Sequence, residues 1–251
     1  MGSSKEHMMD RAYEVMIQWM HVYYDIPEEE EIDENYPDFE RMATSYNEMI
    51  EYQEEQLELK WFEDHPYHEI YSAFGGRMRQ LQNMLATETN PFTDKMIHHM
   101  VYSHAVTLFE AMVGDIIKAC VRKFPEMMDK LVLGVAEITK EKYSLKDIIK
   151  HKGAEGIALT MLNDLTFHNV GIVNQYANML SGKKFESQYE SQMIQITHIR
   201  HDFVHRNGAN KKGEYHDVSS KMVSDAIEVI RLYADDVYQA IRYGVVGSGD
   251  F

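Results

Sequence analysis

The sequence predicts an all-α protein, and three observations support that class. Apolar residues recur at intervals of three and four along most of the 251-residue chain, which is the spacing of one helix face. No persistent alternation of apolar and polar residues, the pattern of a half-buried strand, occurs beside it. The composition is 44% hydrophobic, which is enough to bury a core. We therefore expect helices almost throughout.

The N-terminal third is expected to be helical and strongly acidic. Three helices are predicted, over about residues 7–24, 38–63 and 66–86. The first should end before Asp25-Ile26-Pro27, and the acidic run over residues 28–34 repels itself and should form a mobile loop. The sequence leaves open whether the third helix is broken at Gly75-Gly76. Asn90-Pro91 is the predicted domain boundary.

The negative charge of the chain is concentrated before that boundary. Residues 1–92 hold 6 Lys/Arg against 21 Asp/Glu, a net charge of −15, whereas residues 93–251 hold 19 against 20, a net charge of −1. We therefore expect two parts, an acidic helical extension over residues 1–92 and the main helical domain over residues 93–251. The overall charge of −16 does not exclude a nucleic-acid partner for the second part.

After the boundary, a long helix should run to about residue 123. Its apolar face is broad, which indicates burial on more than one side. Beside that face lies a row of small or polar residues that would let another helix approach closely around one carboxylate, and it consists of Ser103, Thr107, Glu110 and Gly114. Glu110 is thus a candidate partner for a buried cation.

Shorter helices should follow, then two longer ones. Pro125 opens a helix, and two or three short helices are expected before residue 181. The next helix covers about residues 187–206 and stops at Asn207-Gly208, a left-handed C-terminal signal. A last amphipathic helix over about residues 218–243 should be capped by Asp217, Ser219 or Ser220.

Arg200 lies where a core residue is expected. The core-facing stripe of its helix consists of Tyr189, Met193, Ile196 and Phe203, and Arg200 falls on that stripe. A buried guanidinium needs a carboxylate, a subunit interface or a bound phosphate. A purely structural ion pair with Glu110 is therefore one interpretation, and phosphate binding is the other.

His205 lies in the last turn of the same helix, where the helix dipole favours a protonated imidazole. A solvated or capping histidine is the alternative. Five residues correspond to roughly 140° around a helix, so Arg200 and His205 should not point the same way within one chain. Two copies of the helix end could converge across a two-fold axis.

The segment Arg200-His201-Asp202-Phe203-Val204-His205 resembles the signature of the HEPN superfamily, in which four to six residues separate an arginine from a histidine. In that signature a polar residue follows the arginine, and His201 fills the position. The upstream helix around residues 103–112, the continuation Arg206-Asn207-Gly208 and the closing helix are also similar to HEPN proteins. The resemblance covers about residues 93–243.

The resemblance implies an antiparallel helical bundle that dimerises, so that two motifs line one cleft of a metal-independent endoribonuclease. The ribose 2′-hydroxyl would attack the adjacent phosphate, His205 would move protons, and Arg200 would stabilise the charge on phosphorus oxygens. His201 and Asp202 would be auxiliary groups. Flanking phosphates would be held by the residues after the motif, namely Arg206, Asn207, Lys211 and Lys212.

A toxin or defence effector, such as an antiviral one, is the biological role that the resemblance implies, with an antitoxin or sensor protein as a possible partner. HEPN toxins that are regulated by adenylylation often carry a tyrosine two residues after the motif histidine. This chain has Asn207 there, which does not support that route. The acidic region lies outside the resemblance and could be a lid, a docking surface, a mimic of RNA or a solvated extension.

Two other functions stay open. His198, His201 and His205 share a helix face and could bind a metal, although the catalytic glutamate of the zinc-protease motif is missing. A non-catalytic HEPN-like dimer that binds a nucleotide or protein, with Arg200 in its interface, is the second. We expect no cofactor, since no glycine-rich phosphate loop or dinucleotide fingerprint occurs.

The location expected from the sequence is cytoplasmic. No apolar run approaches the roughly 18 to 20 residues of a membrane helix, and the N-terminus lacks an apolar segment of the secretory type. Cys120, the single cysteine, lies in an apolar helical pattern and is expected to be a buried thiol.

Overall fold

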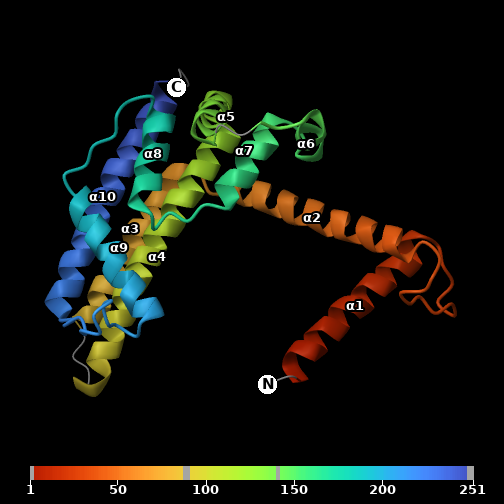
Figure 1. Cartoon of the computed structure of the whole chain (residues 1–251), viewed down its shortest axis with the longest axis horizontal. Coiled ribbons are helices and arrows are strands. Elements are labelled where there is room, and N and C mark those ends of the chain that lie inside the picture. Colours follow the sequence, from red (N-terminus) through yellow and green to blue (C-terminus); the bar gives the residue numbers. More distant parts are fainter. Residues whose placement is uncertain (1–2, 87–90, 140–141, 248–251) are drawn as a thin grey trace. The chain divides into compact units, whose positions relative to one another are not determined.

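The computed structural model of the chain describes residues 3–86, 91–139 and 142–247. Within these ranges it contains ten α-helices and no strand, which confirms the predicted all-α class (Figure 1). The helices are α1 (Ser3–Tyr23), α2 (Phe39–Asp64), α3 (Tyr67–Leu85), α4 (Pro91–Lys123), α5 (Pro125–Thr139), α6 (Leu145–Lys150), α7 (Ala154–Asn163), α8 (Val170–Ser181), α9 (Glu190–His205) and α10 (Ser220–Val246).

The chain divides into two compact units, Met1–Trp61 and Phe62–Phe251. The first unit contains α1, most of α2 and the loop between them, around a small cluster of the buried residues Met20, Ile32 and Met42. Residues 28–34 form a loop, as predicted, and Ile32 anchors it because its side chain is only 5% exposed. The mobility of this loop stays a prediction.

The second unit is a helical bundle built around α4. Helices α3, α5, α9 and α10 all contact α4, and α8 packs against α10 (Figure 1). The largest side chains with almost no exposure in this unit include Tyr102, Phe109, Ile116, Met193 and Tyr233. Cys120 is also buried, as expected, and burial raises the pKa of its thiol.

Helix α3 belongs to this second unit. Its buried residues Ile70, Phe74, Met78 and Leu81 pack in the main core, against α4 and α10. The compact unit therefore begins at Phe62, earlier than the boundary predicted at Asn90-Pro91, and Asn90 lies outside the described residues. The charge count over residues 1–92 hid this, because α3 itself carries one acidic residue, Glu69, against Arg77 and Arg79, and its apolar face is buried by α4 and α10. The helix is continuous through Gly75-Gly76.

The C-terminal elements follow the sequence prediction closely. Helix α9 ends at His205, and the residues after it, Asn207 and Gly208, have positive φ angles of 52° and 87°. Ser219 caps α10, because its side-chain oxygen accepts a hydrogen bond of 3.2 Å from the backbone N–H of Met222. The three short helices α6, α7 and α8 fill the segment before α9.

None of the helices in the described ranges combines the length and the apolar character that crossing a membrane requires.

Candidate functional site

The last two turns of α9 carry the arginine and the histidines, and packing against α4 fixes them. Met193 and Ile196 are buried, and the hydroxyl of Tyr102 on α4 donates to the carbonyl oxygen of Ile196 over 3.4 Å. In the last turn of α9, the ring of Phe203 stacks on His99 of α4, with 4.3 Å between ring centroids. The motif therefore lies on a helix whose inner face is held in place by contacts with α4.

Arg200 lies on the inner side of that helix, as the sequence predicted. Its side chain is 19% exposed, and its Nη2 atom lies 4.0 Å from Oε1 of Glu110 on α4. His168, in the loop between α7 and α8, places Nδ1 3.5 Å from the same carboxylate oxygen. The structure thus brings together the predicted pair, Arg200 and Glu110, and adds a histidine that the sequence did not indicate.

The guanidinium of Arg200 keeps unused hydrogen-bonding capacity. Its Nε atom is buried and has no hydrogen-bond partner among the described residues, and Oε1 of Glu110 is buried without one too. At 4.0 Å the pair balances charge without a proper hydrogen bond. Buried donors without acceptors are costly, so the Nε–H of Arg200 is a donor that Glu110 leaves unused.

His201 and His205 lie together on the solvent side of α9. Both are exposed, and their ring centroids are 4.5 Å apart. The pKa of His201 is lowered from its ordinary value of 6.5, first by partial desolvation and then by the charges of His205 and Arg206. The shift favours the neutral form of His201, which can accept a proton.

The carboxylate of Asp202 contacts residues that follow the motif. Its Oδ1 accepts a hydrogen bond from Nη1 of Arg206 over 2.5 Å, and its Oδ2 lies 2.9 Å from Nε2 of His216. The hydrogen bond with His216, followed by the one with Arg206, holds the pKa of Asp202 below its usual range. Both carboxylate oxygens are thus used to tie the end of α9 to the following loop.

A hollow of about 540 Å³ opens beside this end of α9. We call it the basic hollow, and its lining consists of His198, His201, Asp202, Arg206, Asn210, Lys211 and Lys212. The one carboxylate among them already has two partners. Cationic and imidazole groups therefore dominate the lining, which suits a phosphate ligand.

The sequence-predicted site residues divide into two groups. His201, Asp202, Arg206, Lys211 and Lys212 line the basic hollow, whereas Arg200, His205 and Asn207 are not among its lining residues. Arg200 is mostly buried beside α4 and His205 is exposed, as the rotation of roughly 140° between them requires. A site that uses both residues on one phosphate would need a second chain.

Several site residues were not found from the sequence. His216 comes after a loop and His168 lies between two short helices, so no periodic pattern connects either histidine with its carboxylate. Asn210 could have been found, because Asn210-Lys211-Lys212-Gly213 is a typical turn sequence.

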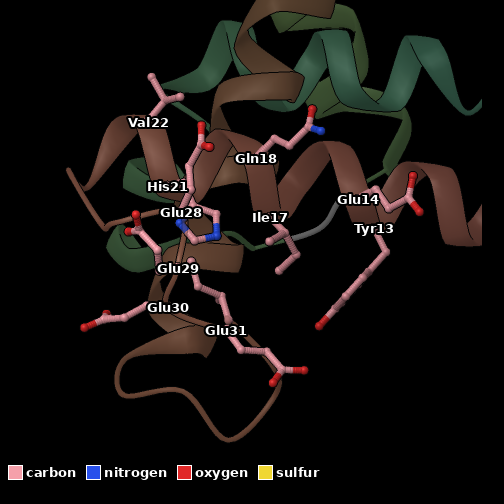
Figure 2. A pocket seen from close by; sticks show the side chains of 11 residues that line it. Tyr13, Glu14, Ile17, Gln18, His21, Val22, Glu28, Glu29, Glu30 and Glu31 are labelled. Carbon is pink, nitrogen blue, oxygen red and sulfur yellow. The ribbon is translucent and has the colours of Figure 1, made fainter.

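A second hollow, of about 800 Å³, lies in the first unit between α1 and the acidic loop (Figure 2). Four consecutive glutamates, residues 28–31, line it together with Glu14 and the apolar side chains of Ile17 and Val22. Its His21 is held by a contact of 3.1 Å between Nδ1 and the carbonyl oxygen of Ile26. Carboxylates repel phosphate, so RNA would not bind in this hollow.

The described residues contain no group of three His, Cys, Asp or Glu side chains arranged to hold a metal ion. The alternative of a metal site on His198, His201 and His205 thus gains no geometric support.

Comparisons of the chain with protein-family models, with curated proteins and with solved structures gave no match. The resemblance to HEPN proteins therefore depends on the residues of this chain alone.

Proposed function

We propose that this protein is a metal-independent endoribonuclease whose site is shared across a homodimer. The observation that carries the proposal is the pair of exposed imidazoles, His201 and His205, 4.5 Å apart beside the basic hollow. Two neighbouring imidazoles can supply the general base and the general acid of RNA cleavage. Arg200, with its unpartnered Nε, supplies the cation on the other side of the motif.

The chemistry is an internal transesterification that needs no added reactant. The base removes the proton of a ribose 2′-hydroxyl, and the oxygen attacks the adjacent phosphorus. The bond from phosphorus to the 5′-oxygen breaks, and that oxygen takes a proton from the acid. The products are a 2′,3′-cyclic phosphate and a 5′-hydroxyl end. His201 suits the role of base because its lowered pKa favours the neutral imidazole.

Arg200 would stabilise the negative charge that builds on the phosphorus oxygens. Within one chain it faces Glu110 and His168 rather than the exposed histidines. In the proposed dimer, Arg200 of one protomer and the imidazoles of its partner would meet at one phosphate, which is the simplest closed arrangement for two identical motifs. Glu110 then holds the guanidinium in place until the substrate binds.

A role as a toxin or defence effector in the cytoplasm follows from the same proposal, since cleavage of cellular RNA stops growth. An antitoxin or sensor protein would then control the enzyme. The basis for this step is the resemblance of the motif to HEPN proteins, which often act in this way.

The second candidate is a non-catalytic dimeric module that binds a nucleotide or a protein. The contact between Arg200 and Glu110 favours it, because a buried ion pair can serve an interface without any chemistry. This candidate predicts that Arg200→Ala weakens dimerisation and that His205→Ala has no effect.

The deciding experiment compares the wild type with His205→Ala and with His68→Ala, an exposed histidine on α3 outside the site. Purified protein is incubated with RNA in chelator, the new RNA ends are identified by sequencing and mass spectrometry, and the oligomeric state is measured by sedimentation. The proposal expects cyclic-phosphate ends from the wild type and His68→Ala, and an intact but inactive dimer for His205→Ala. Equal activity of all three variants, or a wild type that leaves RNA intact, would overturn it.

A further inference from the structure

The segment between α9 and α10 is a small hairpin, residues 207–217, that we call the basic hairpin. An isolated antiparallel bridge joins Ala209 and Tyr215, and the backbone N–H of Asn210 donates to the carbonyl oxygen of Glu214 over 2.8 Å. The side-chain oxygen of Asn210 accepts from the N–H groups of Lys212 and Glu214, and Gly213 has a φ of 82°. The turn is thus well defined and presents Lys211 and Lys212 at its tip.

The base of the basic hairpin is tied to both neighbouring long helices. His216 bonds to Asp202 of α9, and the carbonyl oxygen of Val218 lies 3.0 Å from Nδ1 of His98 on α4. The N–H of Gly208 also donates to the carbonyl oxygen of Asp202 over 3.0 Å. The lysines therefore stand at a fixed place next to His201 rather than on a free loop.

One further side chain on the basic hairpin has no structural explanation. The ring of Tyr215 is 68% exposed, although the backbone of Tyr215 forms the bridge with Ala209 and the next residue, His216, bonds to Asp202. The Nζ atom of Lys95 on α4 lies 6.0 Å from the centre of its ring. An exposed aromatic ring beside a cation is the usual platform on which an unpaired base stacks.

The spacing of these groups fits one strand of nucleic acid. Tyr215 follows Lys212 by three residues, which span at most roughly 10 Å even when extended. Neighbouring nucleotides of a single strand are separated by comparable distances. Lys212 lines the basic hollow and Tyr215 does not, so a strand with a phosphate in the hollow would place an adjacent base outside it, on Tyr215, provided that this base is not paired.

We propose that the basic hairpin is a subsite for an unpaired nucleotide next to the cleaved bond, with Lys211 and Lys212 on its phosphates and Tyr215 under its base. The subsite deepens the proposed ribonuclease function and depends on it for its biological meaning. It makes the protein select unstructured RNA, because a paired base cannot reach the ring.

Binding can be tested separately from cleavage with a fluorescent single-stranded oligonucleotide that carries 2′-O-methyl groups. This probe has no free 2′-hydroxyl, so it cannot be cut by the proposed reaction. Its affinity is measured by anisotropy for the wild-type chain, Tyr215→Ala, Tyr215→Trp and the double variant K211A/K212A, at several salt concentrations. A hairpin duplex of the same 2′-O-methyl composition serves as the paired probe.

The chain offers a matched control at the far end of α10. Tyr243 is also an exposed tyrosine, with Nζ of Lys183 3.8 Å from the centre of its ring. Tyr243→Ala removes the same side chain and the same kind of cation contact at a place away from the basic hollow. Circular dichroism of each variant shows whether the helices are retained.

The proposal expects Tyr215→Ala to bind the single-stranded probe about 5- to 150-fold more weakly, with Tyr215→Trp near the wild type. K211A/K212A should bind more weakly and show a smaller dependence on salt. Tyr243→Ala should bind normally, and the duplex probe should bind less tightly than the single strand. Unchanged binding by Tyr215→Ala, or an equal loss in Tyr243→Ala, would overturn the subsite.

Two further outcomes separate the subsite from the proposed function. If the probe binds as expected but the wild type never cleaves RNA, the subsite stands and the ribonuclease proposal fails. If RNA is cleaved while Tyr215→Ala binds and cleaves as the wild type does, the ribonuclease stands and the subsite fails. Displacement of the probe by polyglutamate at matched ionic strength would instead assign the basic hairpin to an acidic protein partner and would also overturn the subsite.

Discussion

Nη2 of Arg200 lies 4.0 Å from Oε1 of Glu110, and this carboxylate is the only anionic group that the described residues place in ion-pair contact with the guanidinium. The distance is too long for a hydrogen bond, and the buried Nε of Arg200 has no partner among those residues. The carboxylate of Glu110 balances the charge of the guanidinium, but the Nε–H donor of Arg200 makes no hydrogen bond to these residues. Such a guanidinium is held in place and can still take an oxyanion, which is what the proposed reaction requires.

Replacing Glu110 should therefore destabilise the fold. Glu110→Ala leaves the mostly buried cation of Arg200 with no carboxylate, and we expect a loss of roughly 1–3 kcal/mol in the free energy of unfolding. Urea titration followed by circular dichroism measures this loss. Glu137→Ala on α5 is the control, because that residue is exposed and its replacement should change stability by less than about 0.5 kcal/mol. Equal stability of the two variants would contradict a structural role for Glu110.

Gly208 should be sensitive to any side chain. Its φ is 87°, and a Cβ atom there would lie 2.9 Å from Cε1 of His99, whose ring is already stacked on Phe203. Gly208→Ala therefore combines backbone strain with a steric clash, and we expect it to cost roughly 2–3 kcal/mol, measured by urea titration.

Gly213 supplies the matched comparison for that prediction. Its φ of 82° is similar, but no atom lies within 4 Å of the place where its Cβ would be. Gly213→Ala should therefore cost only the backbone strain, about 1 kcal/mol. If Gly208→Ala lost no more stability than Gly213→Ala, the result would contradict the close packing of His99 against Gly208.

Glycines inside two helices should respond in opposite directions. A Cβ on Gly244 of α10 would lie 2.2 Å from the backbone oxygen of Leu180 on α8, so Gly244→Ala must push two helices apart and should cost roughly 2–4 kcal/mol. Gly75→Ala on α3 meets only the tip of Arg79 at 3.8 Å and should stabilise the protein by about 0.5–1 kcal/mol. Thermal unfolding of both variants tests this, and stabilisation by Gly244→Ala would contradict the close contact of α8 and α10.

The helices were largely predictable because their signals are local. Each signal acts within a few residues of its place in the sequence. These signals are the apolar periodicity, Pro125 at the start of α5, Asn207-Gly208 after α9 and the cap at Ser219. The extent of the compact unit was not predictable in this way, because the burial of Phe74 and Met78 depends on helices far along the chain.

The sequence predicted those parts of the candidate site that depend on helix periodicity. The face of α9 predicted that Arg200 points inward, and the small and polar row on α4 predicted Glu110 as its neighbour. The bonds of Asp202 to Arg206 and His216 were not predictable, because the path of the loop that returns His216 to α9 is set by tertiary contacts. Sequence spacing alone had left Asp202 as an auxiliary group of the reaction.

The last prediction concerns the pH dependence of cleavage. The pKa of His201 is lowered below 6.5 in the folded protein. A general base works only when neutral, so the cleavage rate should rise with pH through an apparent pKa below 6.5 and be independent of His201 protonation above it. The rate on a dinucleotide substrate between pH 4 and pH 8, under single-turnover conditions, measures this acidic limb.

Lys211 and Lys212 offer a matched pair for testing the cause of that limb. The charge of Lys211 contributes to the lowered pKa of His201, and the causes of that shift do not include Lys212. Lys211→Ala should therefore move the acidic limb to higher pH, because protonated His201 becomes less unfavourable when a nearby positive charge is removed. Lys212→Ala should leave the limb in place even if it weakens binding. An acidic limb above pH 6.5 in the wild type, or a shift of the limb to lower pH in Lys211→Ala, would remove His201 from the role of base.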